Sequence, residues 1–145
     1  MFYFSGVHEY KVDEKGRVPV PPKFRKELRG EVVMMPGVEK CVQGYAKAGF
    51  ERLVEKLGAD MLAPSKLRKL RRHLLGNAYQ LQIDGQGRVM LPAQLRTQVG
   101  ITDSVVIAGA GMYFELWNPE LWNSEKTTDA EEAWQIVEGL QAQGQ

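Results

Sequence analysis

The chain has 145 residues, of which 43% are hydrophobic and 26% are charged. This balance is typical of a globular protein and excludes a disordered or fibrous one, and the length suits one ordinary domain or two very small ones. No apolar run approaches the roughly 20 residues needed to cross a bilayer, and residues 1–5 lack the basic and apolar segments of a secretory signal. With a single cysteine, Cys41, which permits no internal disulfide, these features predict a cytoplasmic protein with no membrane partner.

Charge is distributed unevenly along the chain. Residues 1–100 contain 18 Lys and Arg against 10 Asp and Glu, a surplus of eight positive charges. Residues 101–145 contain one Lys against eight Asp and Glu, a surplus of seven negative charges. A basic body with an acidic C-terminal end fits a surface that binds a polyanion, and an ordinary fluctuation of charge explains the pattern equally well.

One short unit occurs twice in the sequence. Residues 13–25 read DEKGRVPVPPKFR and residues 84–96 read DGQGRVMLPAQLR, at an offset of 71 residues without a gap. Six of the thirteen positions are identical: Asp13/Asp84, Gly16/Gly87, Arg17/Arg88, Val18/Val89, Pro21/Pro92 and Arg25/Arg96. This agreement indicates a duplication, so two similar halves are expected to pack around a pseudo-two-fold axis.

Each copy predicts the same elements in the same order. A strand ends at an Asp whose carboxylate can accept hydrogen bonds from the following N–H groups, and a Gly three residues on supplies the positive φ of a hairpin loop. The chain then returns as a second strand, a proline starts a short helix and a glycine ends it. In the first copy these are strands at 7–12 and 17–20, a helix at 22–29, a strand at 31–35 and a segment leading to Tyr45. In the second they are strands at 78–83 and 88–91, a helix at 92–99, a strand at 104–108 and a segment at 113–117.

The region between the copies is helical in its pattern. Apolar residues recur at helical spacing from Phe50 to Leu57, and a second helix is predicted from Ser65 to Gly76. In the tail, Asp129 is a plausible cap for an amphipathic helix, which is expected to fray after Gly139. The predicted organisation is a first domain at 5–49, a helical linker at 50–77, a second domain at 78–122 and an acidic, partly helical tail at 123–145.

The repeated arginines are the best candidates for function. A folded core needs the repeated Val and Pro but does not need Arg17 and Arg88, which are expected to project from the hairpin tips. A two-stranded ribbon fits the major groove of DNA, and arginine can fork onto guanine edges or phosphates. Lys15 lies on the first tip, with Gln86 as its counterpart on the second. These four residues form the predicted DNA-binding site.

Other residues that could carry function have simpler interpretations. Arg25 and Arg96, on the short helices, are interpreted as members of structural ion pairs first and as phosphate contacts second. Five basic residues at 66–72 either add phosphate contacts or form a solvated helix face, and the latter is at least as probable. The aromatic residues at 113, 114, 117 and 122 are interpreted as packing in the core or at a subunit interface rather than as stacking on bases.

An enzyme is disfavoured by the same sequence. Its two histidines, His8 and His73, are distant from each other and from Cys41, and none of the three lies in a known nucleophile motif. One cysteine and two distant histidines make no metal site, and Cys41 is interpreted as a small buried residue. The sequence therefore predicts no catalytic residues, no metal, no cofactor and no small-molecule substrate.

With the pair of Asp-x-x-Gly-Arg motifs, the opening Phe4-Ser-Gly6 and the segment Glu115-Leu-Trp117-Asn-Pro, the chain resembles the MraZ family over about residues 5 to 122. That family is built from two tandem SpoVT–AbrB-type domains. The resemblance implies an α+β fold of two pseudo-symmetric, swapped-hairpin, β-rich halves that form a barrel-like core.

The resemblance also implies a function. MraZ proteins are bacterial transcription regulators that bind double-stranded DNA at direct repeats in promoters of the division and cell-wall gene cluster, including their own, and assemble into homo-oligomeric rings. The protein is then expected to be nucleoid-associated, with Lys15, Arg17 and Arg88 as the functional basic residues. Gln86 replaces the lysine in the second copy, so that copy is expected to bind phosphate less strongly.

A protein-interaction module is the main alternative, because AbrB-like domains also occur in antitoxins that hold a partner protein. Antitoxins typically combine one such domain with a tail that wraps around the partner. This chain instead has two copies of the unit and a short acidic tail, which favours DNA as the partner.

Overall fold

The computed structural model describes residues 3–58, 64–126 and 130–143. Its strands are β1 (Val7–Lys11), β2 (Arg17–Pro19), β3 (Glu31–Pro36), β4 (Val42–Tyr45), β5 (Tyr79–Gln82), β6 (Arg88–Met90), β7 (Ser104–Gly109) and β8 (Phe114–Trp117). Its helices are α1 (Pro22–Leu28), α2 (Lys47–Lys56), α3 (Ser65–Gly76), α4 (Ala93–Val99), α5 (Pro119–Glu125) and α6 (Ala130–Gln143). The α+β fold expected from the sequence is confirmed.

The two halves interleave in one antiparallel sheet of six strands, in the order β1-β7-β8-β4-β3-β5. The first strand of each half pairs with the other half, β1 with β7 and β5 with β3, while β4 and β8 pair at the centre. The remaining strands, β2 and β6, form a two-stranded ribbon of their own. This exchange gives the pseudo-symmetric arrangement that the duplication predicts and the swapped strands that the family resemblance implies. Strands from both proposed domains, 5–49 and 78–122, contribute to this one sheet.

The strands on either side of each turn do not form a hairpin ladder, although one isolated antiparallel bridge joins Ile83 to Val89 in the second copy. In the first copy β1 pairs with β7, and β2 pairs with β6, so residues 12–16 connect the two sheets. The physical reason is burial: Val18 and Val89 face each other across the ribbon and are 0% and 1% exposed. A hairpin within one half would leave these side chains without the other half's apolar surface.

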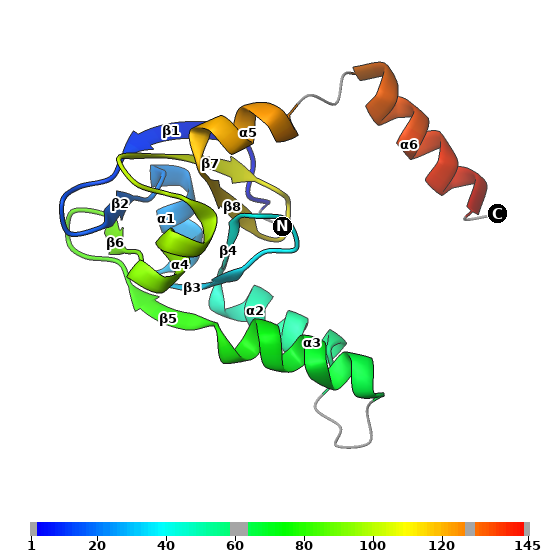
Figure 1. Cartoon of the computed structure of the whole chain (residues 1–145), viewed down its shortest axis with the longest axis horizontal. Coiled ribbons are helices and arrows are strands. Elements are labelled where there is room, and N and C mark those ends of the chain that lie inside the picture. The colour runs from blue at the N-terminus through cyan, green and yellow to red at the C-terminus, as the bar shows by residue number, and fades with distance from the viewer. Residues whose placement is uncertain (1–2, 59–63, 127–129, 144–145) are drawn as a thin grey trace.

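The main core lies between the six-stranded sheet on one side and the β2–β6 ribbon with α1 and α4 on the other (Figure 1). Alternation along β3 divides the strand's side chains between two faces: Val32 and Met34 enter this core, while Val33 and Met35 face the opposite side. β1 and β5 remain at the edges of the sheet. Among the described residues the strands therefore form an open sheet, and the barrel-like closure that was expected is absent.

Two helical groups cover parts of the sheet's outer face. The α2–α3 hairpin packs Leu57 and Leu74 on Val33 and Met35, as the predicted linker helices suggested. At the other end, Leu121 and Trp122 of α5 pack on Val106 and Trp117. Of the aromatic cluster, Phe114 and Trp117 are core residues, whereas Tyr113 and Trp122 are partly buried.

Helix α5 was missed by the sequence analysis, although its starting signal is present. The side-chain oxygen of Asn118 accepts hydrogen bonds from the backbone N–H groups of Glu120 (2.8 Å) and Leu121 (3.2 Å), and Pro119 occupies the first turn. The tail helix α6 continues to Gln143, so the predicted fraying after Gly139 is wrong. Its predicted cap, Asp129, lies outside the described residues. Within the described segments, none of the helices has the length and apolar character needed to cross a membrane.

Candidate nucleic-acid interface

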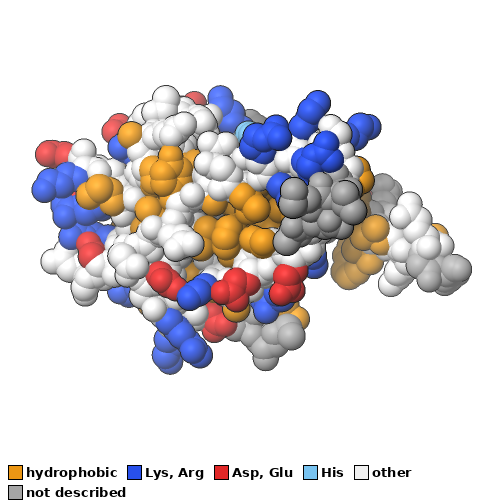
Figure 2. Space-filling view, turned by 90° about the horizontal axis from the view of Figure 1, so that it is seen from below, with side chains coloured by type: hydrophobic (Ala, Val, Ile, Leu, Met, Phe, Trp, Pro, Cys, Tyr) orange, Lys and Arg blue, Asp and Glu red, His pale blue; other side chains and the backbone are white. Residues whose placement is uncertain are grey.

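The two repeated turns lie side by side at one end of the molecule (Figure 1). Reciprocal backbone hydrogen bonds join them: Val20 N–H donates to the carbonyl of Gly87 (2.9 Å), and Leu91 N–H donates to that of Gly16 (3.0 Å). Figure 2 shows Lys and Arg side chains gathered at this same end, on the left, with a few acidic groups beside them. Segments 71 residues apart in the sequence thus make one surface, which carries all four of the predicted site residues.

An aspartate folds each turn. One carboxylate oxygen of Asp13 accepts hydrogen bonds from the backbone N–H groups of Lys15 and Arg17, both at 2.9 Å. Asp84 repeats this with Gln86 at 2.9 Å and Arg88 at 3.0 Å. The Asp-x-x-Gly-Arg spacing is therefore a local folding signal, as the sequence predicts.

Arg17 and Arg88 fold back along their own turns instead of projecting freely from the tips. Arg17 Nε donates to Asp13 Oδ2 at 2.5 Å, and Arg88 Nε donates to Asp84 Oδ2 at 3.1 Å. Arg88 Nη1 also lies 3.8 Å from Asp13 Oδ2, which links the two turns. The two arginine side chains are only 29% and 28% exposed. Each guanidinium carries five N–H groups in a fixed fork, so both arginines keep donors that these bonds do not use.

Lys15 and Gln86 occupy equivalent, exposed positions beside these arginines. The first turn has Lys15 where the second has Gln86, but it also has the exposed Glu14 where the second has Gly85, so the two turns have the same net charge. The stronger phosphate binding expected of the first copy therefore depends on its additional cation and not on a higher net charge.

The pKa values of Asp13 and Asp84 are both lowered from the ordinary value of 3.8. The largest cause is the hydrogen bond from the backbone N–H of Arg17 or Arg88, and desolvation opposes it. A lowered pKa in the folded state contributes stability at pH values above about 3.8, and this contribution is lost as the pH falls through the folded-state value.

The turns are therefore expected to keep their geometry from neutral pH down to about pH 4 and to loosen only below it. An NMR titration of the Asp13 and Asp84 side-chain carboxyl signals should give midpoints below 3.8. A variant with Asp13→Asn should abolish the first midpoint and leave the second in place. A midpoint at or above 3.8 for either group would contradict the hydrogen-bond pattern described here.

The sequence of the whole chain matches the family described as "MraZ protein, putative antitoxin-like" twice, over residues 3–72 and 74–136. A protein of Dehalococcoides mccartyi named "Transcriptional regulator MraZ" is 44% identical over 139 residues, covering 95% of this chain and 98% of the relative. Proteins of the same name from Methylococcus capsulatus (35% identical, 97% of this chain and 94% of the relative) and Roseiflexus sp. (33%, 83% and 85%) are also similar. The chain belongs to the MraZ family.

In this MraZ chain the turn glycines meet arginines of the opposite copy. A Cβ added to Gly16 would lie 2.7 Å from Cζ of Arg96, and one added to Gly87 would lie 2.7 Å from Cζ of Arg25. Arg96 Nε also donates to the carbonyl of Leu91 at 3.1 Å. No carboxylate of the described residues forms an ion pair with Arg25 or Arg96, so their expected ion pairs are not found. These arginines instead pack over the opposite turns, which explains why Gly and Arg are repeated together.

Replacing Gly16 with Ala should destabilise the protein because a side chain there meets two obstacles. Its φ of +81° is unfavourable for an L-residue, and Arg96 fills the space. We expect the free energy of unfolding, measured by urea titration, to fall by roughly 1–3 kcal/mol.

Two matched variants separate the two obstacles. Gly30 has a φ of +89° with nothing within 4 Å, so Gly30→Ala measures backbone strain alone. Gly85 has open space and no positive φ, so Gly85→Ala should change stability by less than about 0.5 kcal/mol. A Gly16→Ala loss no larger than that of Gly30→Ala would show that the Arg96 contact contributes nothing.

The residues considered for catalysis lie apart. His8 packs against the rings of Phe24 (5.6 Å between centroids) and Tyr10 (6.3 Å), and His73 is exposed on α3. Neither joins Cys41, which is buried as predicted.

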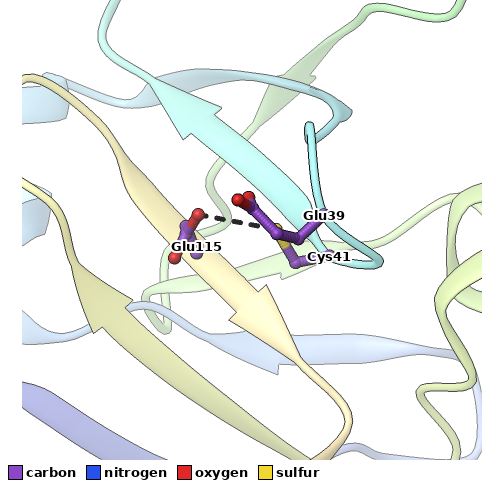
Figure 3. A group of neighbouring side chains, drawn as sticks. All are labelled: Glu39, Cys41 and Glu115. Carbon is purple, nitrogen blue, oxygen red and sulfur yellow. Dashed lines mark hydrogen bonds between the residues drawn. The ribbon is translucent and has the colours of Figure 1, made fainter. Parts of the chain in front are cut away.

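Cys41 instead lies beside two carboxylates that sequence spacing did not indicate. Figure 3 shows the Cys41 thiol beside Glu115 of β8, with Glu39 from the preceding turn next to them. The thiol donates to Glu115 Oε2 at 3.6 Å, and Trp117 Nε1 donates to the other carboxylate oxygen at 3.2 Å. The three ligand atoms lie within 4.8 Å of one another, a spacing from which a cation could be held. Burial first, and then the Glu115 charge, raises the pKa of the thiol, so Cys41 is a protonated donor and not a nucleophile at neutral pH.

The basic residues of α3 lie on a different part of the surface from the turns. Arg71 is held by a hydrogen bond from Nη1 to the carbonyl of Gly58. Lys66, Lys69 and Arg72 are exposed, and Figure 2 shows a second group of Lys and Arg side chains over the α2–α3 hairpin, away from the turn end. Sequence reasoning found these charges, but only the fold separates them from the paired turns.

Proposed function

We propose that this MraZ-family protein is a DNA-binding transcription regulator that contacts duplex DNA through its paired turns, with Lys15, Arg17, Gln86 and Arg88 as the contacting residues. The observation that carries the proposal is the juxtaposition of two equivalent, cation-bearing turns at one end of the fold. The relatives' shared name, "Transcriptional regulator MraZ", supports it and is not the name of an enzyme class.

The geometry of the turns suits a nucleic-acid contact in two ways. The two turns lie side by side at the end of the β2–β6 ribbon, and the major groove, about 12 Å wide, admits a two-stranded element of this kind. The aspartates fix the arginines through Nε, so the remaining N–H groups are pre-oriented for guanine edges or phosphate oxygens. Lys15 adds a point charge on the first turn, and Gln86 adds a neutral hydrogen-bonding group on the second.

Self-association would strengthen binding to repeated sites. We propose a homo-oligomeric ring that places several turn surfaces on the direct repeats of promoters in the division and cell-wall gene cluster, including the protein's own promoter. Linked contacts raise the effective concentration of the second and later binding events, so modest contacts by each subunit become tight binding overall. The protein would act in the cytoplasm on nucleoid DNA, without a cofactor or a small-molecule substrate.

A gel-shift assay and a footprint on the DNA upstream of the protein's own gene test this function. The expected result is protection of short direct repeats. Affinity should also fall steeply as the salt concentration rises, because each neutralised phosphate releases counterions. The logarithm of the binding constant should fall with the logarithm of the salt concentration, with a slope of about −0.9 for each phosphate contact. An affinity that does not change with salt, or the absence of any protected region, would point to a protein partner instead.

A further inference from the structure

Helix α6 has an apolar face that the described part of its own chain leaves uncovered. At helical spacing, this face carries Ala133, Trp134, Ile136, Val137 and Leu140. Trp134 is 66% exposed and Leu140 is 63% exposed, and Figure 1 shows α6 standing away from the rest of the fold. Exposed apolar surface is unfavourable in water, so a helix with this pattern would be stabilised by a partner surface.

The other faces of α6 carry a single sign of charge. The helix contains Glu131, Glu132 and Glu138 but no Lys or Arg. At 100° per residue, Glu131 and Glu138 lie on one flank of the apolar face, next to Trp134, and Glu132 lies on the other flank, next to Ile136. The partner surface should therefore be apolar at its centre and basic along the rim that meets Glu131 and Glu138.

Four hollows border α2, and only one of them has no acidic residue in its lining. The others include a hollow lined by Val33, Phe50 and Val54, whose rim carries Lys47 but also Glu31, Glu51 and Glu55, which would repel an acidic helix. The hollow without acidic residues lies between α2 and the turn that joins β7 to β8. It is lined by Tyr45, Gly49, Arg52, Leu53, Lys56, Met112 and Tyr113.

The hollow without acidic residues, called the α2 cleft below, has a basic rim on one side. Arg52 and Lys56 lie one helical turn apart on α2, and both are exposed. Met112, which is 43% exposed, and the paired rings of Tyr45 and Tyr113 (5.4 Å between centroids) supply the apolar surface.

We propose that α6 of one copy docks in the α2 cleft of a second copy, with Trp134 on the α2 side and with Glu131 and Glu138 against Arg52 and Lys56. Because α6 and the cleft are different surfaces, the contact is heterologous and repeats from subunit to subunit, which produces a closed ring or an open chain. The inference rests on the self-association proposed above and names the surface that mediates it.

Charge reversal in the full-length protein tests this contact. Arg52→Glu with Lys56→Glu, or Glu131→Lys with Glu138→Lys, should each weaken self-association at least roughly tenfold in sedimentation-velocity or light-scattering dilution series. The chain carrying all four changes should recover most of the loss, because the pairing is restored with the signs exchanged. Trp134→Ala with Leu140→Ala should also weaken self-association. Glu51→Lys, on the rim of the hollow that contains Val33, should not.

Three outcomes would overturn the inference. The first is unchanged assembly in both charge-reversed pairs, and the second is failure of the fourfold variant to recover. The third is a contact between α6 and the α2 cleft that persists at every dilution, because such a contact lies within one chain. DNA binding is measured separately on the same variants, with a duplex that contains one repeat. Dissociated subunits should still bind that duplex through their turns. Loss of DNA binding with intact assembly would therefore count against the proposed function and not against the α2 cleft.

Discussion

Alanine at both Arg17 and Arg88 is expected to reduce affinity for promoter DNA by on the order of 10²- to 10⁴-fold, with the fold retained. Each well-placed arginine fork contributes about 1–3 kcal/mol of discrimination between bases, and about 1.4 kcal/mol is a factor of ten in affinity. Either single variant should lose roughly ten- to a hundredfold. The fold should survive because both side chains lie at the surface, and because the backbone hydrogen bonds to Asp13 and Asp84 do not require the guanidinium groups.

Two matched variants make this measurement decisive. Lys47→Ala removes one exposed positive charge on α2, so it reports the general effect of lowering net charge and should change affinity little. Asp13→Asn keeps both arginines and removes the carboxylate that holds Arg17 at its Nε, so an intermediate loss is expected if orientation of the fork matters. Promoter affinity that is unchanged in the double arginine variant, with far-UV circular dichroism also unchanged, would rule out the paired turns as the DNA contact.

Replacing Phe24 with Ala is expected to remove about 3–5 kcal/mol of stability, a large share of the roughly 5–15 kcal/mol of a typical domain. Phe24 is 1% exposed, and its ring lies 5.0 Å from that of Phe4 and 5.2 Å from that of Phe114, between centroids. Phe114 belongs to the second half of the chain, so the cavity opens at the junction of the two copies. Both halves should therefore unfold together at a lower urea concentration.

The tryptophans provide a direct readout, because Trp117 and Trp122 lie in the second half and the third, Trp134, lies on the exposed face of α6 in the tail. Fluorescence should follow the same lowered transition as circular dichroism, although the substitution lies in the first half. Val38→Ala is the control within that half, since Val38 is 86% exposed and its truncation should cost less than about 0.5 kcal/mol. A fluorescence transition that stays at the wild-type position would show that the halves unfold independently.

Much of the local structure could be predicted because local hydrogen bonds determine it. The Asp-x-x-Gly-Arg spacing specifies a turn in which the carboxylate of Asp13 or Asp84 accepts from two nearby N–H groups, and both copies form it. The unbroken apolar run Val32, Val33, Met34 and Met35 is typical of a strand that is buried on both faces, and both faces are covered. The resemblance to the MraZ family, carried by the two motifs, is confirmed by the two matches along the chain.

The arrangement of the candidate site could not be predicted, because it depends on contacts between distant segments. A turn followed by a strand is compatible with a hairpin within one copy, and only burial of Val18 against Val89 selects the exchange between copies. The same exchange places Arg25 over Gly87 and Arg96 over Gly16. In the folded chain Arg17 and Arg88, which were expected to project from the tips, instead form hydrogen bonds with Asp13 and Asp84.

The two equivalent turns, their residues and their positive charges follow from the amino-acid sequence, since these properties depend on a few adjacent residues. The single surface that the turns form, the fixing of Arg17 and Arg88 through Nε, and the exposure of the acidic helix α6 depend on the tertiary structure. Pairing between the copies is selected by the apolar surface that both halves bury together, and neither copy of the repeat contains that surface alone.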